Sequence, residues 1–321
     1  MSHAQGRRRL LHALAAPCIA SLAGCTSLTP PMTAALQAQA PAGLPPRVEL
    51  AGVPFFADDS TLCGPATLAG VLQAAGFAAT PAELAPQVYL PAREGSLQPE
   101  MLAAAARHGA LATRMAPELL ALLRELAAGT PVLVLVNLAL PFWPRWHYAV
   151  LVGYDLGRGE LRLHSGMDGH ASWPMATFEH TWARSGHWAM AVTPPSRLPA
   201  TAELPASREA VLALQRVQGA AASLPAWRAA AARWPQDLVL GMGLGNSLYA
   251  RGDKAEAASQ FEALAARLDS AAAWNNLAQV RWELGQPEAA RQAAQQAWRR
   301  AEQAEPAWAD AVGQTLRQVN P

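Results

Sequence analysis

The chain has 321 residues, of which 51% are hydrophobic and only 15% are charged. This composition excludes a disordered protein, and the formal net charge of +1 gives no reason to expect nucleic acid or an acidic partner. The length is enough for two ordinary domains, each able to bury its own core.

The first 24 residues have the pattern of a secretory signal peptide. Three consecutive arginines at residues 7–9 precede an apolar stretch at residues 10–23. That stretch ends in Leu-Ala-Gly followed by Cys25, which resembles a bacterial lipobox. The resemblance implies cleavage before Cys25 and lipidation of this cysteine. A plain signal peptide or a short membrane anchor is the alternative.

The residues that follow Cys25 indicate where such a lipoprotein would reside. Thr26 is not acidic, so resemblance to sorted lipoproteins implies the outer membrane, on the periplasmic side of the cell envelope. Residues 25–45 are rich in Pro, Ala, Thr and Gln, which is typical of a tether between membrane and domain.

Cysteine usage points to a single reactive thiol. The chain contains only Cys18, Cys25 and Cys63. Signal cleavage would remove Cys18 and lipidation would block Cys25. A lone free cysteine in an exported protein is then better explained as a nucleophile than as packing.

The sequence around Cys63 places that thiol at the start of a helix. Gly64-Pro65 follows it and opens a run of Ala, Leu and Val that extends to Gly76. Proline is well suited to a first helical turn, because its missing N–H would have no partner there. Unpaired N–H groups at a helix N-terminus favour a thiolate, so we expect a lowered pKa for Cys63.

A candidate base comes later, in Trp146-His147-Tyr148 and the apolar run that continues to Tyr154. Its periodicity predicts a strand that holds His147 rigidly. A cysteine and a histidine in contact form a thiolate–imidazolium pair, which activates the thiol near neutral pH. The plain alternative is a buried small cysteine and a strand-end histidine.

These two motifs resemble the papain-like cysteine peptidases of the C39 type. That family carries Cys-Gly-Pro-Ala at the start of a helix and His-Tyr/Phe-x-Val-x-x-Gly-Tyr on a strand, as at Cys63 and His147 here. The resemblance covers residues 46–195 and implies an α+β papain-like fold, a peptide or protein substrate and no cofactor. It also implies that the loop at residues 89–98 lies near the cleft.

Two positions depart from the family pattern. The family has a glutamine five or six residues before the cysteine, where its amide helps to hold the oxyanion; here those positions are Asp58 and Ala57. The family also has an aspartate about sixteen residues after the histidine, where this chain has His164 and Ser165. Either side chain can hydrogen-bond the imidazole, more weakly than a carboxylate. Asp168 and Asp155 are weaker substitutes, because both are expected in turns.

The element order of this first domain fits the same class. Apolar periodicity predicts helices first and a mainly antiparallel sheet afterwards, with a strand at 131–137 buried on both faces and a hairpin of 147–154 with 160–164. This is an α+β order. The remaining histidines show no paired Cys/His spacing, so no metal site is expected. Trp143 and Trp146 can wall the cleft or belong to the core.

The C-terminal third repeats. Prolines at 194–205 mark a linker at residues 196–206, and Gly219, Gly252 and Gly285 follow at equal spacings of 33 residues, each between two helical runs. Residues 207–321 therefore resemble an all-α solenoid of tetratricopeptide repeats, which stack helix pairs around a protein-binding groove. A generic Ala-rich helical bundle is the alternative. The prolines also suggest that few contacts cross the boundary.

The sequence thus supports an exported, lipid-anchored cysteine peptidase with a repeat domain for a protein partner. One alternative is an amidase of peptidoglycan type that uses Cys63, His147 and His164. The other is a peptidase fold without activity, kept as a binding module, which the missing glutamine and aspartate motivate.

Overall fold

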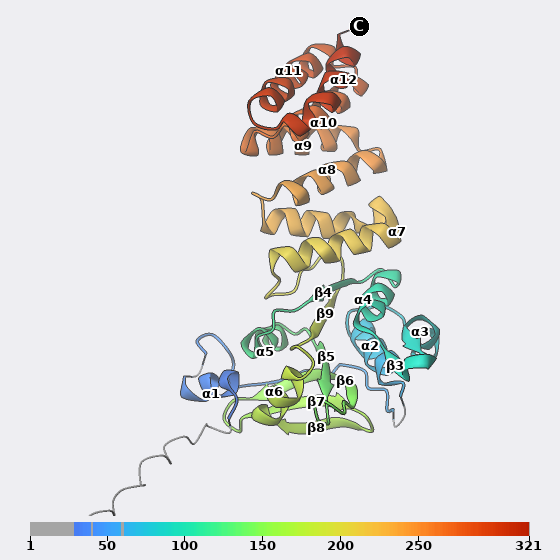
Figure 1. The fold of residues 1–321 in the computed structure, drawn as a ribbon, viewed down its shortest axis with the longest axis vertical. Coiled ribbons are helices and arrows are strands. Elements are labelled where there is room, and N and C mark those ends of the chain that lie inside the picture. The colour runs from blue at the N-terminus through green and yellow to red at the C-terminus, as the bar shows by residue number, and fades with distance from the viewer. Residues whose placement is uncertain (1–28, 40, 59–60, 321) are drawn as a thin grey trace, which may run out of the picture.

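The computed structural model describes residues 29–39, 41–58 and 61–320. The predictions for residues 1–24 and for Cys25 lie outside these ranges. Figure 1 shows a domain of mixed helices and strands, on which a column of helices is stacked. None of the helices in the described ranges is both long and apolar enough to cross a membrane.

The first domain is built on a seven-stranded sheet with the order β4-β9-β5-β6-β7-β8, and β1 pairs with β6 as a branch. The paired strands run antiparallel, as the hairpin pattern predicts. The strands of this sheet are β1 (Arg47–Glu49), β4 (Leu111–Arg114), β5 (Val132–Asn137), β6 (Trp146–Asp155), β7 (Glu160–Ser165), β8 (Asp168–Pro174) and β9 (Ala189–Thr193).

Helices cover both faces of this sheet. The helices of the domain are α1 (Pro31–Ala38), α2 (Cys63–Ala74), α3 (Pro81–Val88), α4 (Gln98–Arg107), α5 (Leu119–Ala127) and α6 (Met175–Ala183). The sequence of strand β5 is apolar throughout because both faces of the strand are buried. Leu133 and Leu135 belong to the core on the side of α2–α4, whereas the alternate Val132, Val134 and Val136 belong to the core on the side of α5 and α6.

Strand β6 carries the histidine motif, and its glycine has a structural reason. A Cβ atom at Gly153 would lie 2.3 Å from the carbonyl oxygen of Val48, so only glycine lets β1 pair here. The hydroxyl of Tyr154 donates to the carbonyl of Pro45 at 3.1 Å. These contacts fix β6, and with it the position of His147 near the strand's beginning.

The structure corrects two expectations about the N-terminal half. The segment 25–45, predicted as a tether, contains α1, because the carboxylate of Glu179 accepts hydrogen bonds from the Met32 and Thr33 N–H groups and the Thr33 hydroxyl. The loop at 89–98 contains a small two-stranded sheet, β2 (Tyr89–Leu90) with β3 (Gly95–Ser96), around the 3-10 turn η1 (Pro91–Arg93).

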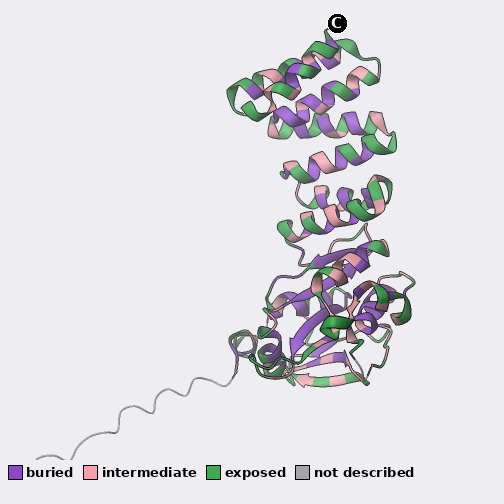
Figure 2. Ribbon diagram, turned by 45° about the vertical axis from the view of Figure 1, so that its right-hand side comes forward, coloured by how far each residue is buried: buried purple, intermediate pink, exposed green. Residues whose placement is uncertain are grey.

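The C-terminal region is entirely helical. It consists of α7 (Leu204–Arg233), α8 (Leu238–Arg251), α9 (Lys254–Leu268), α10 (Ala271–Glu283), α11 (Pro287–Gln303), the 3-10 turn η2 (Pro306–Trp308) and α12 (Ala309–Val319). Gly219 breaks α7 in two, with a φ of 80°. Gly252 follows the last residue of α8, with a φ of 94°. Gly285 lies in the turn after α10, with a φ of 71°. The 33-residue glycine spacing thus marks the turns of successive helix pairs. Figure 2 shows their buried faces turned toward one another.

Contrary to the expectation from the prolines, many contacts cross the boundary between the two regions. Helix α7 packs against β4 and α4. Leu111 of β4 is fully buried in the core of the helical region. The Gln218 amide donates to the carbonyls of Ala106 and Arg107 at 2.9 and 2.7 Å. The proline-rich segment therefore connects two parts that pack against each other and is not a loose linker.

Candidate active site

Cys63 is the first residue of α2, as the sequence predicts. The helix packs on β6. The thiol lies where the N–H groups of Tyr148, Gly64 and Cys63 itself can donate to it. Tyr148 directly follows His147 on β6, so the helix N-terminus and the histidine end of the strand meet.

His147 is the second residue of β6 and is half-buried. Its Nε2 atom lies 2.9 Å from the hydroxyl oxygen of Ser165, the last residue of β7. Ser165 thus occupies the place expected for an orienting side chain.

A crevice opens beside the thiol. Its walls include Cys63, Asp58, Thr67, Tyr148, His164 and Ser165. Its volume of about 10 Å³ leaves room for about one water molecule. A substrate can present its reacting carbonyl here, but its side chains have to lie outside the crevice.

The segment at 89–98 reaches the site as the resemblance implies. The Tyr148 hydroxyl donates to the Ser96 carbonyl at 3.1 Å. A Cβ atom at Gly64 would lie 2.2 Å from the Ser96 hydroxyl oxygen, so the glycine after Cys63 lets β3 approach the helix. The sequence alone did not single out Ser96. The only sequence feature that pointed to it was Gly64, because a glycine can mark a place where another backbone segment approaches closely.

The electrostatics of the pair differ from the expectation. Burial raises the pKa of the Cys63 thiol above its ordinary 9.0; the Asp58 carboxylate raises it further, and the donated N–H bonds only partly offset this. Burial also lowers the pKa of His147 below 6.5, helped by Arg145. Desolvation outweighs the helix terminus here, because it disfavours the charged form of both groups. The resting pair is therefore a thiol and a neutral imidazole.

His164 lies in the crevice wall and not on His147. Its ring hydrogen-bonds the Pro54 carbonyl, its Nδ1 atom has no hydrogen-bond partner, and burial lowers its pKa. Its ring contacts Phe55 edge-on, with 5.3 Å between centroids. Beyond Phe55 and His164, a second hollow of about 240 Å³ extends toward Glu49 and His170.

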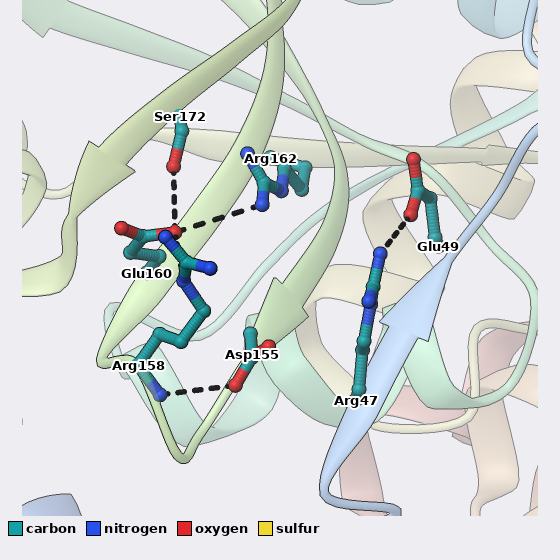
Figure 3. A network of polar contacts seen from close by, with 7 residues as sticks. All are labelled: Arg47, Glu49, Asp155, Arg158, Glu160, Arg162 and Ser172. Atoms are coloured by element: carbon teal, nitrogen blue, oxygen red, sulfur yellow. Dashed lines mark hydrogen bonds and ion pairs between the residues drawn. The ribbon is translucent and has the colours of Figure 1, made fainter.

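The two other aspartates, expected in turns, are the last residue of β6 (Asp155) and the first residue of β8 (Asp168), each next to a turn. Asp168 accepts from the His170 N–H at 2.7 Å. Asp155 accepts from the Arg158 N–H at 3.0 Å, and Figure 3 shows it in a polar network at the opposite end of β6 from His147. Over the described ranges, no three His, Cys, Asp or Glu side chains are placed to hold a metal ion.

Comparison with known proteins concerns the α+β domain. Residues 45–190 match the model of the Peptidase_C39 like family. A solved C39-like peptidase structure from Bacillus anthracis is 19% identical, with a TM-score of 0.41; the match covers 46% of this chain and 97% of that one. No curated protein matches. The α+β domain therefore has a C39-like, cysteine-peptidase-like fold, followed by a helical region outside the match.

Proposed function

We propose that this protein is an exported cysteine peptidase in which Cys63 is the nucleophile and His147 the acid–base group. One observation carries the proposal: Cys63 at the start of α2 meets β6 one residue from His147, whose far nitrogen is held by Ser165. A nucleophile, a base and a group that orients the base are the parts that covalent catalysis requires.

The chemistry starts from the neutral pair. As the Cys63 sulfur attacks the peptide carbonyl carbon, His147 takes the thiol proton and then delivers it to the leaving amine. The product is a thioester on Cys63. Water, deprotonated by His147, attacks the thioester, and the released sulfur regains the proton. Ser165 keeps the imidazole oriented through both steps.

Oxyanion stabilisation falls to the backbone. The N–H groups of Cys63 and Gly64 lie at the start of α2 and point at the sulfur, close to where the negative charge develops. Asp58 lines the crevice where the family has a glutamine amide. A carboxylate cannot donate unless it is protonated, so one donor is replaced by a negative charge.

The test is hydrolysis of a peptide mixture, followed by mass spectrometry. Cys63→Ala should abolish hydrolysis and leave the circular dichroism spectrum unchanged. Ser259→Ala, at an exposed position on α9, is a control that removes a hydroxyl group outside the α+β domain. Undiminished hydrolysis by Cys63→Ala would refute the assignment.

A second candidate function is a binding module without catalysis. The raised pKa of Cys63 favours it, since reactive cysteines usually have a lowered one. This candidate predicts peptide binding by the purified chain, no hydrolysis, and alkylation of Cys63 no faster than that of a free thiol. The amidase alternative needs His164 as a third group, but the ring hydrogen bond of His147 goes to Ser165.

The setting of the enzyme is part of the proposal. The lipobox-like Leu-Ala-Gly-Cys25 supports a lipid anchor on the periplasmic face of the outer membrane, and the stacked helix pairs support a tetratricopeptide-type platform for a protein partner. Cys25→Ser should abolish labelling by a fatty-acid analogue and release the chain from the membrane fraction or leave its signal uncleaved. Unchanged lipid labelling would exclude the anchor.

A further inference from the structure

Large apolar side chains are exposed all around the candidate active site. In the described part of the first domain, all such side chains belong to segments that border the site: Phe55, Leu62, Leu97, Leu140, Phe142, Trp143, Trp146 and Met167. Leu62 precedes Cys63, Leu97 follows Ser96, and Trp146 precedes His147. Met167 follows Ser165 and Gly166 in the turn between β7 and β8.

The most exposed of these side chains lie on the loop at residues 138–146, which we call the aromatic loop. Phe142 is 81% exposed and Trp143 is 78% exposed. A soluble chain ordinarily turns such side chains inward, so an exposed apolar group of this size marks a binding surface.

The aromatic loop is built to hold these side chains outward. Buried Asn137 closes it: the side-chain oxygen accepts from the N–H groups of Ala139 and Arg145 at 3.0 and 2.9 Å. Arg184, just after α6, donates to the Ala139 carbonyl at 2.8 Å. A turn bond from the Trp143 N–H to the Leu140 carbonyl fixes the tip. A loop whose backbone is already fixed loses little conformational entropy on binding.

We infer that the aromatic loop is the substrate-recognition surface of the peptidase, and that it selects peptides with large apolar side chains near the scissile bond. The inference rests on the proposed function. The crevice at Cys63 holds only about 10 Å³, so selection by side chain has to occur outside it. The aromatic loop runs directly into His147, which places its tip within roughly four residues of extended substrate from the reacting carbonyl.

A peptide explains the pattern better than a membrane does. The exposed apolar residues surround the site on several segments and are not confined to one protruding tip. The aromatic loop carries a single charged residue, Arg145, whereas membrane-binding loops gain affinity from several basic residues. Trp143 and Trp146, which the sequence left between cleft wall and core, thus belong to the surface.

The test compares cleavage sites in a defined peptide mixture, read by mass spectrometry. Wild type should cleave bonds with Leu, Ile, Phe, Trp or Met within four residues at least tenfold more often than bonds flanked by polar residues. The double variant Phe142→Ser/Trp143→Ser should lose this preference and still cleave. Val239→Ser, at an exposed apolar position on α8 outside the first domain, should keep it. The same preference in the double variant would overturn the inference.

A binding experiment distinguishes failure of this inference from failure of the proposed function. A labelled twelve-residue peptide of alternating Leu and Ser is titrated, by fluorescence anisotropy, into Cys63→Ala and into Cys63→Ala with the two loop changes. At least tenfold weaker peptide binding to the variant with the loop changes supports the recognition surface, even if wild type hydrolyses nothing. Equal peptide binding to both variants overturns the inference. If the loop changes abolish sedimentation with phosphatidylcholine vesicles and leave peptide selection unchanged, the surface is a membrane contact and the inference is wrong.

Discussion

At the scale of single residues, the unusual feature is that burial keeps both reacting groups neutral. The pKa of His147 is lowered from 6.5 and that of Cys63 is raised from 9.0. Below the imidazole pKa, His147 holds an extra proton and cannot act as base. Above the thiol pKa, the pair lacks the proton that the leaving amine needs.

We therefore predict a broad pH plateau for kcat/KM. The acid limb should fall below pH 6.5 and the alkaline limb above pH 9, because kcat/KM reports the pKa values of the free enzyme. Asp58→Asn should shift both limbs to lower pH, since the carboxylate raises the pKa of both groups. An alkaline limb well below pH 9 would show instead a resting thiolate–imidazolium pair.

Ser165 gives a second residue-scale prediction. Ser165→Ala removes the partner of the His147 Nε2 atom and should lower kcat/KM roughly fivefold, which corresponds to about 1 kcal/mol of hydrogen bonding. Ser165→Asp should raise the pKa of His147 by charge, which moves the acid limb upward. Ser259→Ala, at an exposed position on α9, serves as the control. If Ser165→Ala retains full activity with an unchanged pH profile, Ser165 has no orienting role.

At the scale of elements, the approach of β3 to α2 decides the geometry of the site. Gly64→Ala would place a methyl group 2.2 Å from the Ser96 hydroxyl oxygen and 2.6 Å from its Cβ. Such overpacking costs about 1–3 kcal/mol and should displace the start of α2, so both the melting temperature and activity should fall. Ser96→Gly in the same chain should restore both. Failure of this rescue would mean that the contact does not limit the position of Cys63.

The sequence predicted those elements whose signal is local. Continuous apolar residues identified β5, and Pro65 placed Cys63 at the start of a helix. Helix α1 was missed because its composition resembles a tether and its stability comes from distant Glu179. His164 and Ser165 could not be separated either, because the register shift at the end of β7 sets which one faces His147.

At the scale of the whole molecule, the helical region supports the first domain. Leu111 of β4 is buried among side chains of α7 and its neighbours, and Gln218 caps the end of α4. Removing residues 207–321 would expose Leu111, a loss of about 1.5–3 kcal/mol, together with its apolar neighbourhood. The prolines at 194–205 suggested a first domain that folds independently. The packing indicates instead that the stability of the first domain depends on the helical region.

We therefore predict that the fragment 29–206 aggregates or melts at a lower temperature than the full chain. Leu111→Thr in the fragment should recover solubility, because threonine suits an exposed strand. The same substitution should destabilise the full chain. A soluble fragment with an unchanged melting temperature would show that the helical region serves only as a docking platform.

The central claim is that Cys63 and His147 act together on a peptide carbonyl. Its most direct test is the labelling rate of Cys63 by a peptidyl electrophile, followed by intact mass and compared with that for iodoacetamide. The account predicts one label per wild-type chain, at Cys63, and at least 100-fold slower peptidyl labelling in His147→Ala, with the iodoacetamide rate changed far less. Equal peptidyl labelling of wild type and His147→Ala would contradict the pairing and leave the α+β domain as a binding module.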